Sequence, residues 1–98
     1  PMPDRRVYSA DDPNVVVPVS LRQTVPPYPG EVFEARTGSV EVIIDETGAV
    51  ESAVIRTSIE ARYDMAIVTA AKGWKYKPAT LNGVPIKFRK TIQIAVRR

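Results

Sequence analysis

The stretch that decides the fold is Gly73-Trp74-Lys75-Tyr76-Lys77-Pro78-Ala79, where the spacing of the apolar residues changes. Before it, small and apolar residues recur at the intervals of one buried helix face, at Tyr63, Ala66, Ile67, Ala70, Ala71 and Trp74. Within it, Trp74 and Tyr76 alternate with lysines, which is the period of a strand. We therefore expect a helix to end at Gly73, in the left-handed conformation that closes many helices. The last strand of the domain is expected to begin there, with Trp74 and Tyr76 plugging the core.

Two strands are expected before the helix. The first opens at Gly38 and carries apolar residues at every second position as far as Ile44. Asp45-Glu46-Thr47-Gly48 follows as a hairpin turn, with its glycine placed to take a positive φ. The second strand runs over residues 49–57. The parity of its apolar residues changes part of the way along, so we expect a bulge near Ser52.

The helix and a final strand complete the order. Thr57-Ser58-Ile59-Glu60 has the spacing of a capping box, so the helix is expected from there to about Lys72. Asn82-Gly83 then indicates a second hairpin turn. Apolar and polar residues alternate over the final strand, residues 86–96, except that Lys90 interrupts the apolar row. We expect either a bulge at Lys90 or a strand that extends beyond its cover there. The order strand, strand, helix, strand predicts an α+β fold, a small three-stranded antiparallel sheet with the helix packed on one face.

Prolines divide the chain unevenly, since seven of the nine lie within the first 29 residues. We expect residues 1–26, called the lead below, to be extended and loosely packed, with a short added strand at 15–17. The compact domain is expected to cover residues 27–98. Just inside it, residues 31–36 are expected to form one helical turn that presents Val32 and Phe33 inward.

Composition excludes several kinds of site. The chain has no cysteine and no histidine, which excludes zinc, haem, thiol chemistry and histidine-based catalysis. Asp45 and Glu46 are neighbouring carboxylates, but they lack the alternating ligands of a calcium loop and suit a turn. No spacing singles out another catalytic group, so we expect a protein that is not an enzyme and needs no cofactor or metal. The net charge of +3 favours anionic partners only weakly.

An ordered series of motifs resembles the C-terminal domain of TonB-type energy transducers. The series consists of Tyr28-Pro29, Gly38-Ser39-Val40-Glu41-Val42, Asp45-Glu46-Thr47-Gly48-Ala49-Val50, Trp74-Lys75-Tyr76-Lys77-Pro78-Ala79 and Asn82-Gly83-Val84-Pro85. The element Trp-x-Tyr-x-Pro-Ala after the helix is its most specific part. The run Val25-Pro26-Pro27-Tyr28-Pro29 departs from the enterobacterial form, in which a Gln-Pro precedes the Tyr-Pro. Contacts of that glutamine are therefore not carried over to this chain.

The resemblance implies a periplasmic protein-binding module. In the family, a proline-rich spacer tethers this domain to an inner-membrane helix, and the domain grips a short segment of an outer-membrane receptor by adding that segment as a strand to its sheet. Force from the inner-membrane motor complex then opens the receptor. The sequence opens on Pro1 rather than on methionine, so we expect a processed or excised piece whose full-length protein is anchored in the inner membrane.

For this chain, the partner strand is expected along the edge of residues 86–96. The expected partner-binding residues are the outward-facing polar residues of that strand and a nearby pair, namely Lys87, Arg89, Thr91, Gln93, Tyr28 and Pro29. Strand addition obtains affinity from main-chain hydrogen bonds and tolerates varied side chains, which suits a receptor grip.

Two other functions stay open at this level. A faint resemblance to the start of an RNA-recognition strand lies in Lys72-Gly73-Trp74-Lys75-Tyr76. Lys75, however, occupies the position at which that motif has a small residue. We therefore expect no nucleic-acid partner. A long apolar last strand with an open edge also invites pairing with a second copy, which would make a homodimer. The same domain could then serve as an oligomerisation or interaction domain fused to another protein, without a role in transport.

Overall fold

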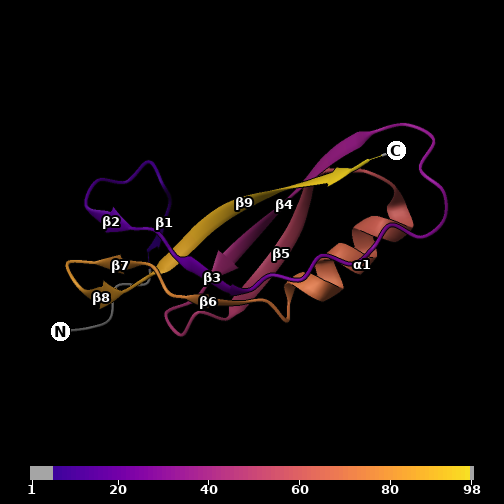
Figure 1. The fold of residues 1–98 in the computed structure, drawn as a ribbon. Helices are drawn as coiled ribbons and strands as arrows, with labels where there is room; N and C mark the ends of the chain where they lie inside the picture. Colours follow the sequence, from indigo (N-terminus) through magenta and orange to yellow (C-terminus); the bar gives the residue numbers. More distant parts are fainter. Residues whose placement is uncertain (1–5, 98) are drawn as a thin grey trace.

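The structure, a computed structural model, describes residues 6–97 (Figure 1). Residues 1–5 of the predicted lead and Arg98 of the predicted domain lie outside the described residues. The elements in chain order are β1 Val7–Tyr8, β2 Val15–Val16, β3 Val19–Arg22, β4 Arg36–Ile44, β5 Val50–Thr57, α1 Ala61–Ala71, β6 Lys75–Lys77, β7 Thr80–Leu81, β8 Val84–Pro85 and β9 Lys87–Val96. No helix within the described part of the chain is long and apolar enough to cross a membrane.

The main sheet has the strand order β1-β9-β4-β5. β4 and β9 pair antiparallel without a break, from Arg36 opposite Val96 to Ile44 opposite Phe88. The α+β class is confirmed, but the prediction of three strands in the order β-β-α-β is wrong. A fourth strand, β1, joins the sheet in parallel, and three short strands come between the helix and β9. Two of these short strands, β6 and β7, pair with the lead, while β8 pairs with β7. Sequence periodicity does not reveal the strands with which the lead pairs.

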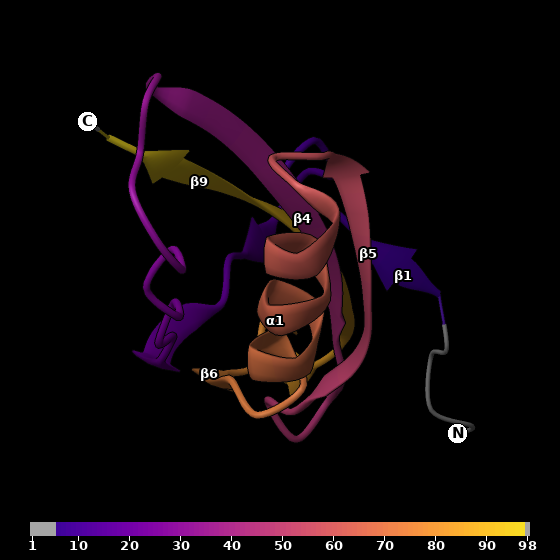
Figure 2. The ribbon, with the colours of Figure 1, turned by 90° about the vertical axis from the view of Figure 1, so that its right-hand side faces the viewer.

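Helix α1 lies across β4 and β5 on one face of the sheet (Figure 2). The main core between them is formed by Val40, Val42, Ile44, Ile59, Tyr63, Ile67, Ala71, Trp74, Tyr76, Ile92, Ile94 and Val96. Four of the six residues predicted on the buried helix face are buried, whereas Ala66 is exposed and Ala70 is half-buried. The buried stripe is therefore narrower than predicted, because one short helix covers only part of the sheet face.

The helix ends near Lys72 as predicted, but its start and the conformation of Gly73 differ from the prediction. Glu60, three residues after the predicted start, is the N-cap, and its carboxylate accepts the N–H of Tyr63 at 3.1 Å. At the other end, Gly73 does not take a positive φ. Its N–H and that of Trp74 instead donate to the carbonyls three residues back, at 3.0 Å each, which tightens the last turn. This tight turn satisfies the final carbonyls without a left-handed residue and directs Trp74 into the core.

The predicted turns and bulge are confirmed. Asn82 and Gly83 both take positive φ, at 53° and 81°, as a two-residue hairpin turn of type I′ requires. Gly48 has φ 90°, and a Cβ there would meet the Tyr76 carbonyl oxygen at 1.8 Å, so only glycine fits between the hairpin and β6. Between β4 and β5 the register shifts at Ile43 and Ile44, where Glu51 is the extra residue beside the predicted Ser52.

Lys90 points inward without a bulge, because β9 keeps a regular register with β4 on both sides of it. Its ammonium group lies 5.2 Å from the centre of the Tyr76 ring, so a cation–π contact takes the place of an apolar contact. Residues 31–36 form no helix and Phe33 is 77% exposed, so the expected helical turn and the inward Phe33 are wrong. Val32 is half-buried and packs against the main core, as expected. Gly30, at φ 93°, turns the chain away from helical geometry just before this segment.

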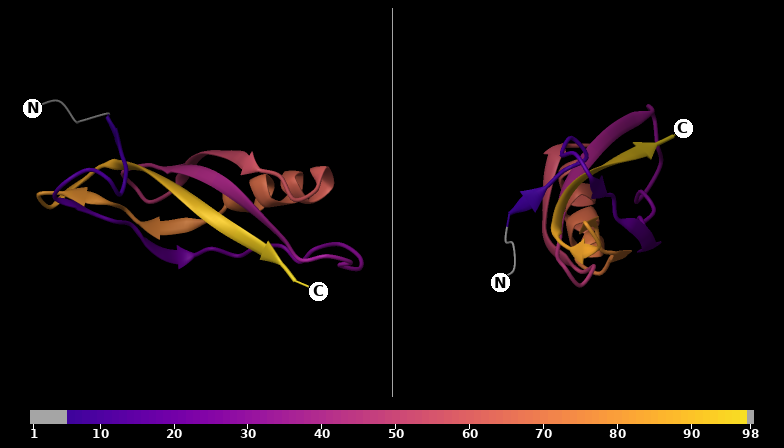
Figure 3. Two further views of the ribbon diagram at one scale, coloured as in Figure 1. Left: turned by 90° about the horizontal axis from the view of Figure 1, so that it is seen from above. Right: turned by 90° about the vertical axis from the view of Figure 1, so that its left-hand side faces the viewer.

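The lead is extended, but it is held more firmly than expected. β2 pairs with β7 and β3 pairs with β6, and the lead then runs alongside α1 (Figures 1 and 3). The indole N–H of Trp74 donates to the carbonyl of Thr24 at 2.7 Å, and the Tyr63 hydroxyl donates to that of Pro26 at 2.6 Å. The Tyr76 hydroxyl donates to the side chain of Gln23. Buried aromatic N–H and O–H groups need acceptors, and the lead supplies them.

We expect Trp74→Ala to lower the free energy of unfolding by about 3–5 kcal/mol, because it removes a large, 1% exposed side chain from the core. In a domain of this size the melting temperature should fall by more than about 10 °C. Trp74→Phe is the control, since it keeps an aromatic ring but loses the bond to Thr24 and part of the buried volume, and its loss of stability should be smaller. A melting temperature of Trp74→Ala within a few degrees of wild type would contradict the assigned role.

Stability should also fall in alkali through Tyr76. Burial raises the pKa of Tyr76 from 10.0 to about 12. Between these values the unfolded chain loses the phenolic proton while the folded chain keeps it, so the free energy of unfolding decreases as the pH rises. Urea unfolding of wild type and Tyr76→Phe, compared across this pH range, should show the steeper decrease in wild type. Equal slopes would show that the phenol does not titrate differently in the two states.

Candidate functional site

The outer edge of β9 is the candidate site. β1 pairs with β9 only at Lys87 and Phe88, and no other described strand pairs with this edge from Arg89 to Val96. Ten residues of β9, less the two paired with β1, leave eight with an open backbone edge. At roughly 3.3 Å per residue, this edge is about 26 Å long. Figure 3 shows β9 running along the molecule to the C-terminus.

The sheet has a second edge at β5, and the two edges differ in regularity. The register between β5 and β4 shifts twice, once between Ser39 and Val40 and once between Ile43 and Ile44. Each bulge disrupts the run of backbone donors and acceptors, which is one way in which proteins protect a sheet edge. β9 has no such shift against β4. The regular edge of β9 is therefore the better template for an added strand.

The charged side chains predicted at the site are paired with the chain's own sheet. Arg89 contacts the carboxylate of Glu41 at 2.6 Å, and Arg56 contacts the other oxygen of the same group. Lys87 contacts Glu51, and a hydrogen bond with Glu51 is the main cause that raises the pKa of Lys87. These cross-strand pairs bridge β9, β4 and β5. Lys87 and Arg89 are thus held across the sheet surface instead of projecting toward a partner strand.

Thr91 and Gln93 are exposed, as the alternation along β9 predicts. The structure describes no bond of either side chain, so both present polar surface beside the open edge. Lys87, by contrast, lies at the part of the edge that β1 covers. The predicted β9 residues therefore divide into three that flank the open edge and one, Lys87, that does not.

Tyr28 lies at the other end of the edge. Its ring meets that of Tyr63 edge-on, with centroids 5.2 Å apart and an interplanar angle of 79°. It shares a groove of about 400 Å³ with the last residues of β9, and the lining residues are Val25, Pro26, Pro27, Tyr28, Val32, Tyr63, Ala95, Val96 and Arg97. Pro29 is exposed and does not line this groove. The structure thus brings Tyr28 to β9, while Pro29 stays outside.

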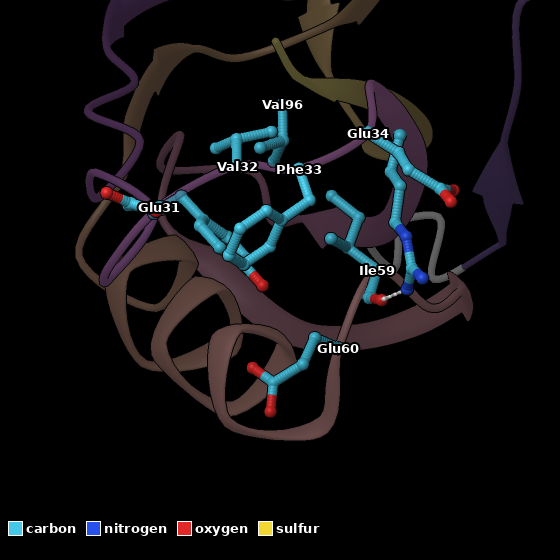
Figure 4. A pocket seen from close by; sticks show the side chains of 9 residues that line it. Glu31, Val32, Phe33, Glu34, Ile59, Glu60 and Val96 are labelled. Atoms are coloured by element: carbon cyan, nitrogen blue, oxygen red, sulfur yellow. Dashed lines mark hydrogen bonds between the residues drawn. The ribbon is translucent and has the colours of Figure 1, made fainter. Parts of the chain in front are cut away.

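A second hollow adjoins this groove across Tyr28 and Val96 (Figure 4). It has a volume of about 280 Å³ and is lined in addition by Glu31, Val32, Phe33, Glu34, Arg36, Ile59 and Glu60. Arg36 donates to the carbonyl of Ile59 at 3.0 Å, which joins the start of β4 to the loop before α1. The residues missed by sequence reasoning, above all Pro26, Pro27 and Val96, line the first groove. The proline run was the available signal, but it did not reveal which strand it meets.

The acidic turn between β4 and β5 is structural. The Asp45 carboxylate accepts the Thr47 N–H and hydroxyl and the Ala49 N–H, at 2.9, 2.6 and 3.1 Å. Burial would raise the pKa of Asp45, but these hydrogen bonds outweigh burial, and with the nearby Lys87 they lower the pKa. Among residues 6–97 no group of three or more acidic side chains is placed to hold a metal ion.

Comparison with known proteins identifies one family. The family model for the Gram-negative bacterial TonB protein C-terminal matches residues 25–96, which includes β4 through β9 and the grooves at Tyr28. Neither the curated proteins nor the solved structures gave a match.

Proposed function

Because the chain belongs to the family of Gram-negative bacterial TonB protein C-terminal domains, we propose that it grips a short segment of an outer-membrane receptor. The segment adds as a strand to the open edge of β9, over Arg89–Val96. The domain itself is a TonB-type periplasmic domain, and its hold on the receptor would couple inner-membrane energy to transport. The observation that carries the proposal is the eight-residue edge of β9, which is regular and unpaired among the described residues.

The chemistry of the edge supports binding through the backbone. An added strand bonds to main-chain N–H and C=O groups, and these are present whatever the side chains are. Arg89 is already paired with Glu41, and Thr91 and Gln93 are short polar groups beside the edge. Main-chain bonds would therefore supply most of the affinity, and one site could accept several receptor segments.

The groove at Tyr28 supports a second contact. It is bordered by Pro26, Pro27 and the last residues of β9, so a segment leaving the edge near Val96 would run over aromatic and proline side chains. Aromatic rings bury a large area with little loss of side-chain entropy and are common at interfaces. This groove would select among receptor segments by their side chains, whereas the edge would select for an extended backbone.

The family relationship also supports a link to an inner-membrane motor complex through an anchor outside the residues described. The proposed role is mechanical and non-enzymatic, because force on the domain would pass through the added strand to the receptor. A second copy of the chain could take the same edge and form a homodimer. Binding measurements should therefore be made at protein concentrations at which sedimentation shows a monomer.

We expect backbone changes to weaken receptor binding more than charge changes. The probe is a panel of synthetic peptides that cover the N-terminal segments of outer-membrane receptors from the same bacterium. Replacing both Lys87 and Arg89 by alanine should weaken binding less than about fivefold at physiological salt, because exposed ion pairs contribute about 0–1 kcal/mol. Thr91→Pro or Gln93→Pro should weaken binding at least tenfold if that N–H faces outward, because the incoming strand then lacks a donor.

Lys90→Pro and Ile92→Pro are the matched controls, because N–H groups alternate in direction along a strand. One of the two sets should break the bonds to β4 and unfold the domain, and circular dichroism will show which. The other set should stay folded and lose binding. Wild-type binding by every folded proline variant, with binding abolished in the double alanine variant, would show a charged surface patch and refute strand addition.

We expect nucleic-acid binding to be weak, since the net charge is only +3 and several basic side chains are paired with acids. Titration with single-stranded RNA and duplex DNA at physiological salt should give dissociation constants no tighter than the electrostatic background of about 10⁻⁴–10⁻⁶ M. Sub-micromolar binding to either would support the nucleic-acid alternative.

A further inference from the structure

The first described residues of the lead cover one end of the β9 edge. We call residues 6–12 the strap. Val7 and Tyr8 pair in parallel with Lys87 and Phe88, and the chain then turns away from the sheet. The strap lies before residue 25, outside the residues that the family model matches. The chain therefore adds a device of its own to an edge that the matched residues build.

The strap is anchored by a buried side chain. Tyr8 is 7% exposed and packs in a second, smaller core with Ala79, Ile86 and Phe88. Val15 of β2 and Leu81 of β7 pack against this core from the side. A parallel pairing of two residues would be weak by itself. The burial of the Tyr8 side chain therefore stabilises the contact of β1 with β9.

A closed turn directs the strap off the edge. The Asp12 carboxylate accepts the Ser9 N–H at 2.8 Å and pairs with the Arg6 guanidinium at 2.7 Å. The Asp12 N–H donates in return to the Ser9 carbonyl at 3.1 Å. These contacts close the turn directly after Tyr8, so the chain stops following β9 at that point.

The strap turns away from β9 after Phe88, where the open edge begins. A groove of about 450 Å³ lies between the strap and β9, lined by Ser9, Ala10, Asp11, Phe88, Arg89, Lys90 and Thr91. A strand added over Arg89–Val96 would meet Ser9 and Ala10 at one end. To continue past Arg89 it would have to displace Tyr8 from its core.

We propose that the strap is a stop that limits the partner strand to Arg89–Val96 and so sets its register on β9. The inference rests on the proposed function, since it concerns the same edge. It assigns to Tyr8 and Asp12 a role in specificity: receptor segments are selected for a paired stretch of eight residues or fewer. The strap acts by occupying the backbone groups of Lys87 and Phe88, so the side chains of the partner do not enter into this limit.

The test uses the tightest-binding peptide of the receptor panel and versions of it that are extended by two and by four residues at either end. Amide hydrogen exchange of the wild-type protein is measured with each peptide. We expect peptide-induced protection within Arg89–Val96 and none at Lys87 or Phe88, however long the peptide is. Affinity should stop rising once the paired stretch fills the open edge.

Two variants release the strap by different means. Tyr8→Ala removes the buried anchor, and Asp12→Ala opens the turn at the surface without touching a core. Val16→Ala is the matched control, because it removes an exposed apolar side chain from β2 and leaves β1 held. In each released variant the extended peptides should protect whichever of Lys87 and Phe88 has its N–H on the outer edge. They should bind about two- to tenfold more tightly than in wild type, the range expected for one added backbone hydrogen bond. The unextended peptide should bind wild type and each released variant with the same affinity.

The possible outcomes separate a failure of the stop from a failure of the proposed function. Protection of Lys87 or Phe88 by an extended peptide in wild type overturns the stop without reference to any variant. Equal length dependence in wild type and in a folded released variant overturns it as well. Peptides that bind wild type but protect residues elsewhere, or that do not bind at all, refute the proposed function itself. That result differs from a failure of the stop, because it is already seen with the unextended peptide.

Discussion

The fold depends on the burial of Trp74 at the end of α1. The ring fills the space between the helix and the sheet, and its N–H has to find an acceptor in the core. The acceptor is the carbonyl of Thr24, which belongs to the lead and lies fifty residues earlier in the chain. Trp74 thus joins the helix, the core and the lead. Tyr63 and Tyr76 repeat this arrangement on either side, with acceptors at Pro26 and Gln23.

This constraint explains how the outer edge of β9 stays open. The hydrogen bonds from the aromatic residues hold the lead beside them, and there β3 pairs with β6 and not with β9. Among the described residues of the lead, only β1 pairs with β9, and the burial of Tyr8 holds it at one end of the strand. Eight residues of regular strand remain available, while the opposite edge at β5 is broken by bulges. An open regular edge is normally an aggregation hazard, so its retention favours a binding role.

The charged side chains of β9 are paired within the sheet itself. Glu41 forms ion pairs with Arg56 and Arg89, and Glu51 forms one with Lys87. The charges on the outer face of the sheet are therefore paired with one another. Exposed pairs of this kind contribute little to stability or to affinity. What the surface offers to a partner is a row of backbone groups, with an aromatic and proline groove at one end and the strap at the other.

The sequence by itself determined the local elements: the α+β class, the two glycine turns, the bulge beside Ser52 and the burial of Trp74 and Tyr76. These follow from periodicity and from the φ angles that glycine alone tolerates, which neighbours along the chain decide. Only the tertiary structure decided the path of the lead, the conformation of Gly73 after the helix and the pairing of Lys87 and Arg89. Short lead strands carry no period long enough to reveal a partner, and acceptors fifty residues away leave no local trace. The location of Tyr28 beside Val96, and hence the shape of the candidate site, is decided by such long-range contacts.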